Sequence, residues 1–413
     1  MATNSEIPQI TGPSQGPLVC PATPTETAAF GQATPWQRVE DAFRAAHHDP
    51  DLTAVRAIYA AAAAHRLPGA TVWMFAVAPP SSGKTEALMP LQRVGAHIIS
   101  GVTPQTFVSG WTIRKKGQSA EQGRDASLLN RIKNGIIVCK DFSQVLSMPL
   151  KTKGPILADL RDIYDGYIAK EYGTGERKEW TGRITFLAGV TQEIDSHYSV
   201  YQTLGERFVQ IRWKRPGGVK AALTAMKHAN VQRTRRAVEK AVSNLLKPIL
   251  TSTPATPRIS AAAQRRIANL AEFTVRARTH VPRDGYTREI LYMPEAEASP
   301  RLAQQLEQLA RGSALLDGRL AVDSNDVALV ERVAFDSIRA DRRAILDTLR
   351  SKRQFSVTQL ATAARLSQPS VSRRVEELQG LGLVEWERSD SFDESLVRLG
   401  EHALQLLAGV ADD

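Results

Sequence analysis

The hydrophobic residues of this chain change their spacing from one region to the next. In residues 36–47 and 52–67, apolar and alanine positions recur at the spacing of a helix. Between 71 and 213, short apolar runs rich in β-branched and aromatic residues alternate with helical patterns, which is typical of a parallel sheet covered by helices. From 216 to about 340 the spacing is almost wholly helical. We therefore expect an α/β fold with a helical pair before the sheet and a helical region after it.

The last part of the chain combines short helices with short strands. The predicted elements are helices at 342–349, 357–364 and 368–378, a two-stranded wing at 383–387 and 395–399, and a closing helix at 401–407. We expect the hydroxyls of Ser356 and Ser367 to cap the second and third helices, because a serine oxygen accepts from the first free N–H groups of a helix.

Composition narrows the class of protein. Residues 1–35 hold six prolines and few apolar side chains, so we expect a disordered tail there. Two cysteines exclude a disulfide scaffold and a cysteine-based zinc cluster. No apolar run approaches the ~18–20 residues of a membrane span, and the amino terminus lacks the features of a signal peptide. We expect a cytoplasmic protein whose net charge of +10 favours an anionic partner, DNA first.

A candidate phosphate-binding loop follows the first buried strand. It comprises Ala78, Pro79, Pro80, Ser81, Ser82, Gly83, Lys84 and Thr85, and a helical segment begins at Glu86. This is a Walker A pattern with alanine at the first glycine position. In such a loop, backbone N–H groups surround the phosphates, Lys84 reaches the β and γ oxygens, and the Thr85 hydroxyl binds Mg²⁺. The sequence therefore predicts ATP and Mg²⁺ as ligands.

A candidate carboxylate for the metal lies at the end of a second strand. An apolar run that begins at Gly135 ends in Asp141, as in a Walker B strand, although a turn residue at this place is the alternative. Cys139 then lies inside a buried strand as a packed thiol. Phe142 follows where hydrolytic relatives carry glutamate. Glu86 either faces the γ-phosphate or matches the helix dipole, so binding is better supported than hydrolysis.

The order of the next elements narrows the kind of P-loop protein. Two short strands at 168–172 and 177–181 flank a glycine-rich turn, a buried strand at 184–190 ends before Thr191, and Gly-Glu-Arg-Phe leads into a strand at 209–213. This order resembles the AAA+ ATPases with a hairpin before the sensor-1 strand, which include MCM helicases, MoxR-type ATPases and magnesium-chelatase subunits. The Lys-Asp-Phe sequence at Asp141 also resembles ATPases of phages and integrated elements.

The resemblance implies roles for three further residues. Thr191 takes the sensor-1 position, where the family usually has asparagine. Arg207 looks like the arginine finger that completes a neighbouring subunit's site, and an ordinary salt-bridged arginine is the alternative. Arg301, in Ser-Pro-Arg, looks like sensor 2. Such a site works only in a ring or open spiral, so the resemblance implies a homo-oligomer with ATP bound between protomers.

The positive charge is concentrated after the sheet. Residues 211–290 contain 17 Lys and Arg against 4 acidic residues, a net +13 that exceeds the whole-chain value. These residues either form solvated helix faces or a surface for DNA phosphates. Arg177 and Lys178 at the hairpin, and the basic loop 114–116, add further positive charge. In the resembling helicases the hairpin lines a DNA channel, which implies DNA contact by Arg177 and Lys178.

The C-terminal elements resemble the winged helix-turn-helix of bacterial regulators such as the MarR type. In that arrangement the third helix enters the major groove. The residues it exposes here are Gln368, Ser370, Ser372, Arg373 and Arg374. Such modules also dock proteins. The wing tip argues against wing–DNA contact, because its acidic residues would face phosphates; these are Glu387, Asp390, Asp393 and Glu394.

Together these patterns predict five segments: a tail at 1–35, a helical pair at 36–67, a P-loop AAA+ core at 68–215, a helical lid at 216–338 and a winged helix at 339–413. The function that we expect is an oligomeric ATPase acting on DNA, a helicase or a replication-initiation ATPase of a mobile element. Two alternatives remain open: a nucleotide-gated transcriptional regulator, and a MoxR-like remodeller of proteins.

Overall fold

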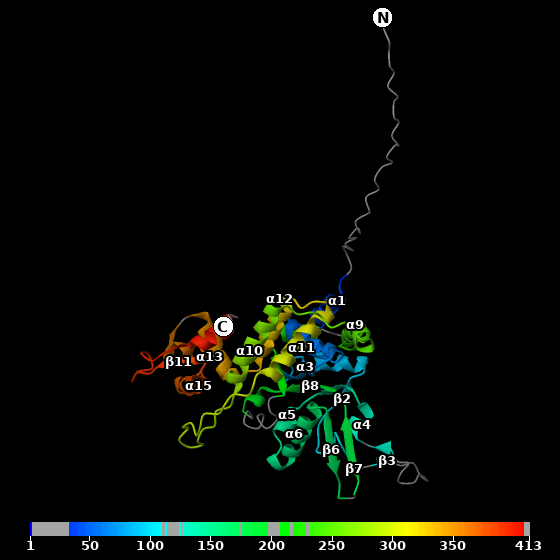
Figure 1. The fold of residues 1–413 in the computed structure, drawn as a ribbon, viewed down its shortest axis with the longest axis horizontal. Coiled ribbons are helices and arrows are strands. Elements are labelled where there is room, and N and C mark those ends of the chain that lie inside the picture. Colours follow the sequence, from blue (N-terminus) through cyan, green and yellow to red (C-terminus); the bar gives the residue numbers. More distant parts are fainter. Residues whose placement is uncertain are drawn as a thin grey trace. The chain divides into compact units, whose positions relative to one another are not determined.

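The computed structural model describes residues 1, 33–109, 112–113, 124–125, 127–173, 175–196, 207–214, 218–227, 231–352 and 354–408 (Figure 1). The chain divides into two units, Met1–Ala33 and Thr34–Asp413, and every element below belongs to the second. Residues 2–32, most of the predicted tail, lie outside the described residues. The finer division of the second unit into domains stays a prediction.

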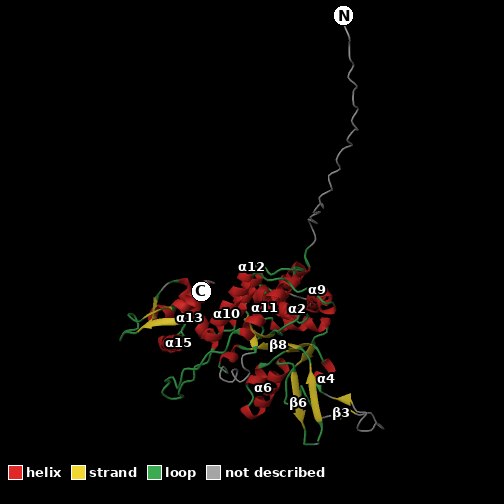
Figure 2. Ribbon diagram, viewed as in Figure 1, coloured by secondary structure: helices red, strands yellow, loops and turns green. Residues whose placement is uncertain are grey.

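A parallel sheet of five strands forms the centre of the α/β fold (Figure 2). Its order is β2 (His97–Ile99), β5 (Gly135–Cys139), β8 (Ile184–Val190), β1 (Trp73–Val77) and β9 (Phe208–Arg212). Every neighbouring pair is parallel. The carboxyl ends of all five strands therefore lie at one edge of the sheet, which confirms the α/β expectation.

The side chains of β1 divide between two hydrophobic cores, one on each face of the sheet. Met74 and Ala76 belong to one core, while Trp73 and Phe75 belong to the other. This division follows from the alternation of side chains along a strand. Because both faces are covered, the strand is apolar at every position, and all five of its residues are buried.

Helices before and between the strands cover the sheet. They are α1 (Pro35–Ala46), α2 (Leu52–Ala64), α3 (Lys84–Leu88), η1 (Met89–Val94), α4 (Leu128–Ile132), α5 (Ser143–Leu146), α6 (Leu150–Tyr164) and η3 (Gln192–Asp195). The Thr34 hydroxyl accepts from the Gln37 N–H at 3.1 Å, so helix α1 begins inside the segment predicted as tail. Helix α6 begins at Leu150 and contains Pro155 in its interior.

Two antiparallel ribbons project beyond the central sheet. The short pair is β3 (Thr112–Ile113) with β4 (Arg124–Asp125). The longer pair is β6 (Tyr167–Glu171) with β7 (Arg177–Thr181), and Glu171 lies opposite Arg177 next to the turn. This second ribbon confirms the hairpin predicted from two short strands around a glycine-rich turn.

The helical region contains α8 (Gly218–Lys227), α9 (Val231–Thr251), α10 (Ala261–Arg278), α11 (Pro300–Leu316) and α12 (Ser324–Asp336). Helix α11 packs closely on alanine-rich α2. A Cβ added to Gly312 would lie 2.1 Å from the carbonyl oxygen of Ala60, so only glycine permits this approach. Residues 279–299 form a long connection without helix, so the expectation of an almost wholly helical region is wrong there.

The C-terminal elements follow α12 directly. They are α13 (Ala340–Ser351), β10 (Phe355–Ser356), α14 (Val357–Ala364), α15 (Gln368–Gly380), β11 (Val384–Glu387), β12 (Leu396–Leu399) and α16 (Glu401–Ala408). Ser356 caps α14 as predicted, with its hydroxyl accepting from the Gln359 N–H. Ser367 precedes α15 without that bond, because its hydroxyl donates to Ser370 instead. Strand β10, which sequence analysis missed, adds a third strand to the wing.

None of the helices in the described part of the chain combines the length and the apolar character that crossing a membrane requires.

Candidate functional site

Three loops meet at the carboxyl edge of the central sheet, after β1, β5 and β8. The backbone N–H of Ala78 donates to the carbonyl oxygen of Val190 at 3.1 Å. The N–H of Phe142 likewise donates to the carbonyl oxygen of Gly189 at 2.8 Å. These bonds join the segment after β8 to the two segments beside it. The residues that follow the three strands are therefore held together by backbone contacts.

The segment 78–85 turns sharply from β1 into α3. Ser81 and Gly83 have positive φ angles of 60° and 91°, and Gly83 immediately precedes the first helical residue, Lys84. A Cβ added at Gly83 would meet no atom within 4 Å. Steric contact with the protein therefore does not require glycine here, but the left-handed backbone at Gly83 favours it. The close approach of a phosphate, which the sequence predicts, would be a second reason.

The amino group of Lys84 folds back onto this loop. Its Nζ donates to the carbonyl oxygens of Ala78 at 2.7 Å and Val190 at 3.1 Å. Burial lowers the pKa of Lys84, and the negative charge of Asp141 opposes that shift. The two charged groups therefore share one side of the sheet edge. An ammonium held by neutral carbonyls can exchange them for an anionic acceptor, which forms stronger hydrogen bonds.

Asp141 and Thr191 are connected through Ser143. Asp141 Oδ1 accepts from the Ser143 N–H at 3.0 Å, and the Ser143 hydroxyl oxygen accepts from the Thr191 N–H at 2.8 Å. The hydroxyl oxygens of Thr191 and Ser82 are buried and have no hydrogen-bond partner among the residues that the structure describes. A buried hydroxyl left unpaired costs about 1–3 kcal/mol. These two polar atoms at the same edge fit a site that a polar ligand completes.

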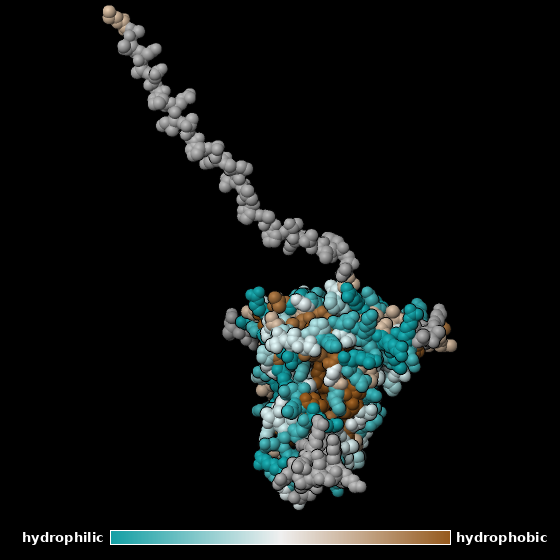
Figure 3. Space-filling view, turned by 90° about the vertical axis from the view of Figure 1, so that its right-hand side faces the viewer, coloured by the Kyte–Doolittle hydropathy of each residue, from teal (hydrophilic) through white to brown (hydrophobic). Residues whose placement is uncertain are grey.

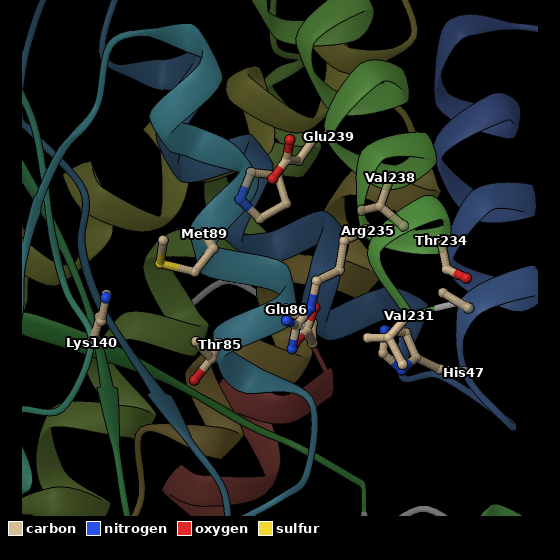
Figure 4. Close-up of a pocket in the computed structure, with 12 residues that line it drawn as sticks. His47, Thr85, Glu86, Met89, Lys140, Val231, Thr234, Arg235, Val238 and Glu239 are labelled. Carbon is tan, nitrogen blue, oxygen red and sulfur yellow. Dashed lines mark hydrogen bonds and ion pairs between the residues drawn. The ribbon is translucent and has the colours of Figure 1, made fainter. Parts of the chain in front are cut away.

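A pocket of about 440 Å³ opens beside the first residues of α3 (Figure 4). Thr85, Glu86 and Lys140 border it, and Arg235 of α9 reaches in from the other side. Arg235 Nη2 lies 2.5 Å from Glu86 Oε1, and its Nε lies 3.0 Å from both carboxylate oxygens. The remaining lining is partly apolar, with Ala46, His47, Met89, Pro90, Val231, Thr234, Val238 and Glu239. Hydrophobic side chains gather in the middle of the face nearest α9 (Figure 3).

A second pocket of about 150 Å³ borders the loop itself and shares Ala46 and His47 with the first. Ser81, Ser82 and Gly83 form one wall. The opposite wall includes the segment between α1 and α2, together with Trp213 and Lys214 after β9. The loop 78–85 is thus bordered by two pockets, one toward Lys140 and one toward Trp213. Neither pocket was predicted in the sequence analysis, because both depend on segments far apart in the chain.

Arg207 lies at the opposite edge of the sheet from Lys84. It precedes β9, which runs parallel to β1, so the start of β9 is remote from the loop that follows β1. Arg207 Nη2 lies 2.7 Å from Asp165 Oδ2, and the side chain is only 10% exposed. Gln305 Nε2 of α11 donates to the Arg207 carbonyl at 2.7 Å. The structure therefore does not bring Arg207 to the Lys84 of its own chain.

Arg301 lies near Arg207 rather than near Lys84. Arg301 Nη1 donates to Glu297 at 2.7 Å. The Arg207 guanidinium lies 5.6 Å from the centre of the Tyr164 ring. Arg301 begins the same helix, α11, whose Gln305 Nε2 donates to the Tyr164 hydroxyl at 2.6 Å. Lys84, Asp141 and Thr191 thus share one edge, and the two predicted arginines share the other.

The hairpin side chains are paired within the ribbon. Arg177 is exposed and lies 3.6 Å from Glu171 and 3.5 Å from Glu179. Lys178 Nζ lies 3.7 Å from Glu176. The acids around them neutralise much of the local positive charge, so DNA contact by Arg177 and Lys178 stays a prediction.

Some predicted features fall outside the described residues, namely the basic loop 114–116 and the segment 204–206 before Arg207. Among the residues that the structure describes, no three His, Cys, Asp or Glu side chains are grouped to hold a metal ion. A bound Mg²⁺ would therefore depend on Thr85, Asp141 and the oxygens of its phosphate ligand. The buried thiol of Cys139, whose pKa burial raises to about 12, confirms the prediction of a packed side chain.

The second and third C-terminal helices pack as a compact pair. Gln368 Nε2 of α15 donates to the Thr358 hydroxyl of α14 at 2.9 Å. Arg373 Nε donates to the Pro369 carbonyl at 3.1 Å. Val371 on the other face of α15 is fully buried. Gln368, Ser370 and Arg373 are therefore partly exposed, as the sequence predicts for an element that enters a groove. Ser372 departs from that prediction, because its hydroxyl oxygen is buried and has no hydrogen-bond partner among the described residues.

A family model described as a helix-turn-helix domain matches residues 340–386. The match spans α13, α14 and α15 and reaches β11. The chain carries a C-terminal helix-turn-helix domain. No curated protein matches the chain. The domain indicates DNA binding or regulation through this part of the molecule.

Arg374, another predicted contact residue of the helix-turn-helix domain, faces inward. Arg374 Nε donates to Asp341 at 2.7 Å, and its Nη1 donates to Glu377 at 2.5 Å. The side chain is 19% exposed. The expectation that Arg374 is displayed beside Arg373 is therefore wrong, because the two acids draw it toward α13 and away from the outer face.

Glu377 is the centre of a buried ion cluster in this domain. Arg342 lies 2.8 Å away, Arg283 2.8 Å away and Arg374 2.5 Å away, and Glu377 is 1% exposed. Burial acts to raise the pKa of Glu377, but the three arginines outweigh it and bring the pKa to about 2. The sequence carries no signal for this cluster, because its members come from three separate elements: the 279–299 connection, α13 and α15.

The wing of the domain is acidic, as predicted. Glu387, Asp390, Asp393 and Glu394 are all exposed. Arg388 is an exception, with its guanidinium 4.2 Å from the centre of the Trp386 ring and 3.2 Å from Glu376 of α15. The acidic tip argues against close approach of this wing to phosphates.

Proposed function

We propose that this chain is an ATP-binding AAA+ protein that acts on DNA from an oligomer, as a helicase or a replication-initiation ATPase of a mobile element does. One observation carries the proposal. Lys84, Asp141 and Thr191 follow three strands of one parallel sheet and meet at its carboxyl edge, in a chain that also carries a helix-turn-helix domain. Carboxyl edges of parallel sheets are where such folds bind ligands.

The residues at this edge suit a nucleotide with its metal ion. Lys84 would exchange the Ala78 and Val190 carbonyls for phosphate oxygens. The unpaired Ser82 hydroxyl supplies a further polar contact, while Thr85 and Asp141 would hold Mg²⁺. Mg²⁺ neutralises the charge that develops on the phosphates during transfer. The pocket of about 150 Å³ between Ser81 and Trp213 would contact part of the nucleoside of the ligand.

The opposite placement of Arg207 and Arg301 supports an oligomer. Neither arginine reaches its own chain's loop, yet the family resemblance assigns both to the γ-phosphate. A second copy that packs its β9 edge against the first copy's loop would satisfy that role, because Arg207 would then lie beside the neighbour's Lys84. In this arrangement Arg207 supplies positive charge where negative charge develops.

Hydrolysis depends on a group that orients water. Phe142 follows Asp141 directly, so no carboxylate occupies that position. Glu86 borders the pocket with Thr85 and is held by Arg235. We propose Glu86 as the water-orienting carboxylate, and Thr191 as the hydroxyl that assists it, since its Oγ1 is buried and unpaired.

The same absence of a carboxylate after Asp141 favours a second candidate function, a nucleotide-gated DNA-binding regulator. Here ATP would act as a slow switch and the helix-turn-helix domain would be the output. A MoxR-like remodeller remains the third alternative, and no specific contact of the described residues favours it.

The deciding experiment is ATP turnover by the purified full chain, measured with and without duplex and single-stranded DNA. We expect turnover that depends on Mg²⁺ and rises with DNA. Negligible turnover together with an ATP-dependent change in DNA affinity would favour the regulator. Turnover indifferent to DNA, with little salt dependence of any DNA binding, would favour the remodeller, because phosphate contacts make affinity fall steeply with salt.

A further inference from the structure

The connection between α10 and α11 is unusually long for two helices that pack together. Helix–helix connections of about 2–8 residues are typical, and much longer ones are usually functional. Residues 279–299 separate α10 from α11. The end of this connection is fixed, because Glu297 lies 3.0 Å from Arg278 and 2.7 Å from Arg301. The middle of the connection therefore projects from a fixed base.

That middle part, residues 282–291, folds into a tight hairpin, which we call the connector hairpin. Arg283 and Ile290 form an antiparallel bridge. The Leu291 N–H donates to the Pro282 carbonyl at 3.0 Å, and the Asp284 N–H donates to the Glu289 carbonyl at 2.9 Å. The turn is closed by Asp284, whose carboxylate accepts from two backbone N–H groups at 2.7 Å each. The hairpin is thus an organised element.

Arg283 fastens the connector hairpin to α15. Its side chain is only 12% exposed. Nη2 donates to the Arg373 carbonyl at 2.7 Å and to Glu376 at 2.9 Å, while Nε donates to Glu377 at 2.8 Å. These charge-assisted bonds fix the hairpin beside the helix that is expected to enter the groove.

The hairpin and the wing lie on either side of Glu376. Arg283 of the hairpin contacts one carboxylate oxygen of Glu376, and Arg388 of the wing contacts the other at 3.2 Å. Glu376 is on the outward part of α15, with 35% of its side chain exposed. The outer face of α15 is therefore flanked by two projecting elements, as the loop beside α15 in Figure 1 also shows.

Charge distinguishes these two elements. The wing tip, residues 388–394, has one arginine against three acids, a net charge of −2. The connector hairpin has two arginines and two acids, a net charge of zero. Arg283 is engaged by Glu376 and Glu377 and Asp284 by the turn, which leaves Arg288 and Glu289 at the tip. Of the two flanks, the hairpin is therefore the one that tolerates phosphates.

The tip of the connector hairpin displays side chains suited to a DNA backbone. Tyr286 is 95% exposed, and Arg288 is exposed without a salt bridge to any described residue. Tyr292, just beyond the hairpin, is 63% exposed. Arginine and tyrosine side chains are common donors to phosphate oxygens. An exposed arginine and tyrosine on an anchored turn are preorganised for such contacts, since little ordering is needed on binding.

We propose that the connector hairpin, through Arg288 and Tyr286, contacts the phosphate backbone of duplex DNA beside the groove occupied by α15. This contact lies on the flank of α15 that the acidic wing does not occupy. The inference rests on duplex binding by the helix-turn-helix domain. It adds a contact element that lies outside residues 340–386, the part matched as a helix-turn-helix domain.

The test is fluorescence anisotropy of the full chain with a labelled mixed-sequence duplex of about 30 base pairs, three helical turns. The variants are Arg288→Ala and Tyr286→Ala, with Arg44→Ala on α1 as the matched control, since Arg44 is similarly exposed. We expect Arg288→Ala to weaken binding about 3- to 10-fold and to reduce the slope of log affinity against log salt by about 0.9. Tyr286→Ala should weaken binding with an unchanged slope, and Arg44→Ala should change neither.

A variant on α15 separates failure of this inference from failure of DNA binding itself. If Arg373→Ala weakens binding while Arg288→Ala and Tyr286→Ala bind like the unaltered chain, the hairpin only supports α15 structurally and the inference is overturned. If the unaltered chain does not bind the duplex, the proposed DNA binding and the inference fail together. Thermal melting checks the fold. Arg283 Nη1 contacts Arg288 through its backbone carbonyl at 2.7 Å, which Arg288→Ala keeps, so we expect unchanged transitions.

Discussion

Arg235 on α9 and Glu86 on α3 form an ion pair 2.5 Å long across the pocket beside Thr85, although 149 residues separate them in the chain. The pair joins the helical region to the first turn after the phosphate-binding loop. A carboxylate in this position has two possible uses, the orientation of water and the balance of the helix dipole.

Glu86→Gln distinguishes these uses. We expect kcat for ATP to fall about 10²-fold with KM nearly unchanged, because general-base assistance typically contributes 10²–10⁴-fold. Steady-state ATPase kinetics measure this. Arg235→Ala is the companion variant: it removes the same ion pair but leaves the carboxylate, so its turnover should persist. Equal loss in both variants would assign Glu86 to the ion pair alone.

Lys84→Ala should abolish detectable ATP binding. The substitution removes the ammonium group that would meet the β and γ phosphates, together with its bonds to Ala78 and Val190. A titration with a fluorescent ATP analogue measures the loss, and Lys151→Ala, an exposed lysine on α6, is the control. Undiminished affinity in the Lys84 variant would refute a phosphate role for the loop.

Asp141→Asn should separate metal-dependent from metal-independent binding. The amide keeps the shape of the side chain and can still accept from the Ser143 N–H, while the charge that would hold Mg²⁺ is lost. We expect ATPase activity to fall at least about 10²-fold, with ADP affinity in the absence of Mg²⁺ unchanged. Calorimetric titrations with and without Mg²⁺ test this. A protein that remains equally active would exclude Asp141 from the metal site.

Arg207→Ala should be inactive alone and regain turnover when mixed with Lys84→Ala. In a mixed oligomer some interfaces combine the intact loop of one variant with the intact Arg207 of the other. Asp165→Asn is the matched control, because it removes the Arg207–Asp165 pair yet keeps the guanidinium. We expect the ATP turnover of the mixture to exceed the sum of the turnovers of the two variants alone. A turnover equal to that sum would contradict a site shared between subunits.

Glu377→Gln should destabilise the protein by about 3 kcal/mol at neutral pH, because three arginines would lose a buried counter-charge. The pKa of Glu377 lies near 2, below its ordinary value of 4.5. Its contribution is therefore present above pH 4.5 and is lost as the pH falls toward 2. Denaturant unfolding from pH 7 to 2 measures both effects. Glu385→Gln, in the exposed pair with Arg398, should leave the transition nearly unchanged.

The sequence was sufficient for the local elements. The buried strands β1 and β8, the hairpin β6–β7 and the capped helix α14 follow from spacing, turn residues and a serine cap, all of which act between residues close in the chain. The candidate loop 78–85 was found the same way, since its residues are consecutive.

Features that join distant segments were not predictable in this way. The Glu86–Arg235 pair and the pocket between Ser81 and Trp213 depend on how α9 and the α1–α2 segment pack over the sheet. The inward turn of Arg374 depends on Asp341, which lies two helices earlier, on α13. A single sequence contains no signal for such pairings, because charged residues at helical spacing are also typical of solvated faces.

The Glu377 cluster has a consequence for how this protein is divided. One of its three arginines, Arg283, lies outside residues 340–386, and Arg342 also donates to the carbonyls of Ala277 and Thr279 in and after α10. A fragment that starts at α13 would keep a fully charged, buried carboxylate but lose part of its neutralisation. The helix-turn-helix domain therefore cannot be excised without loss of charge balance, because residues outside it complete the neutralisation of Glu377. A fusion protein that carries this domain would also need the connector hairpin.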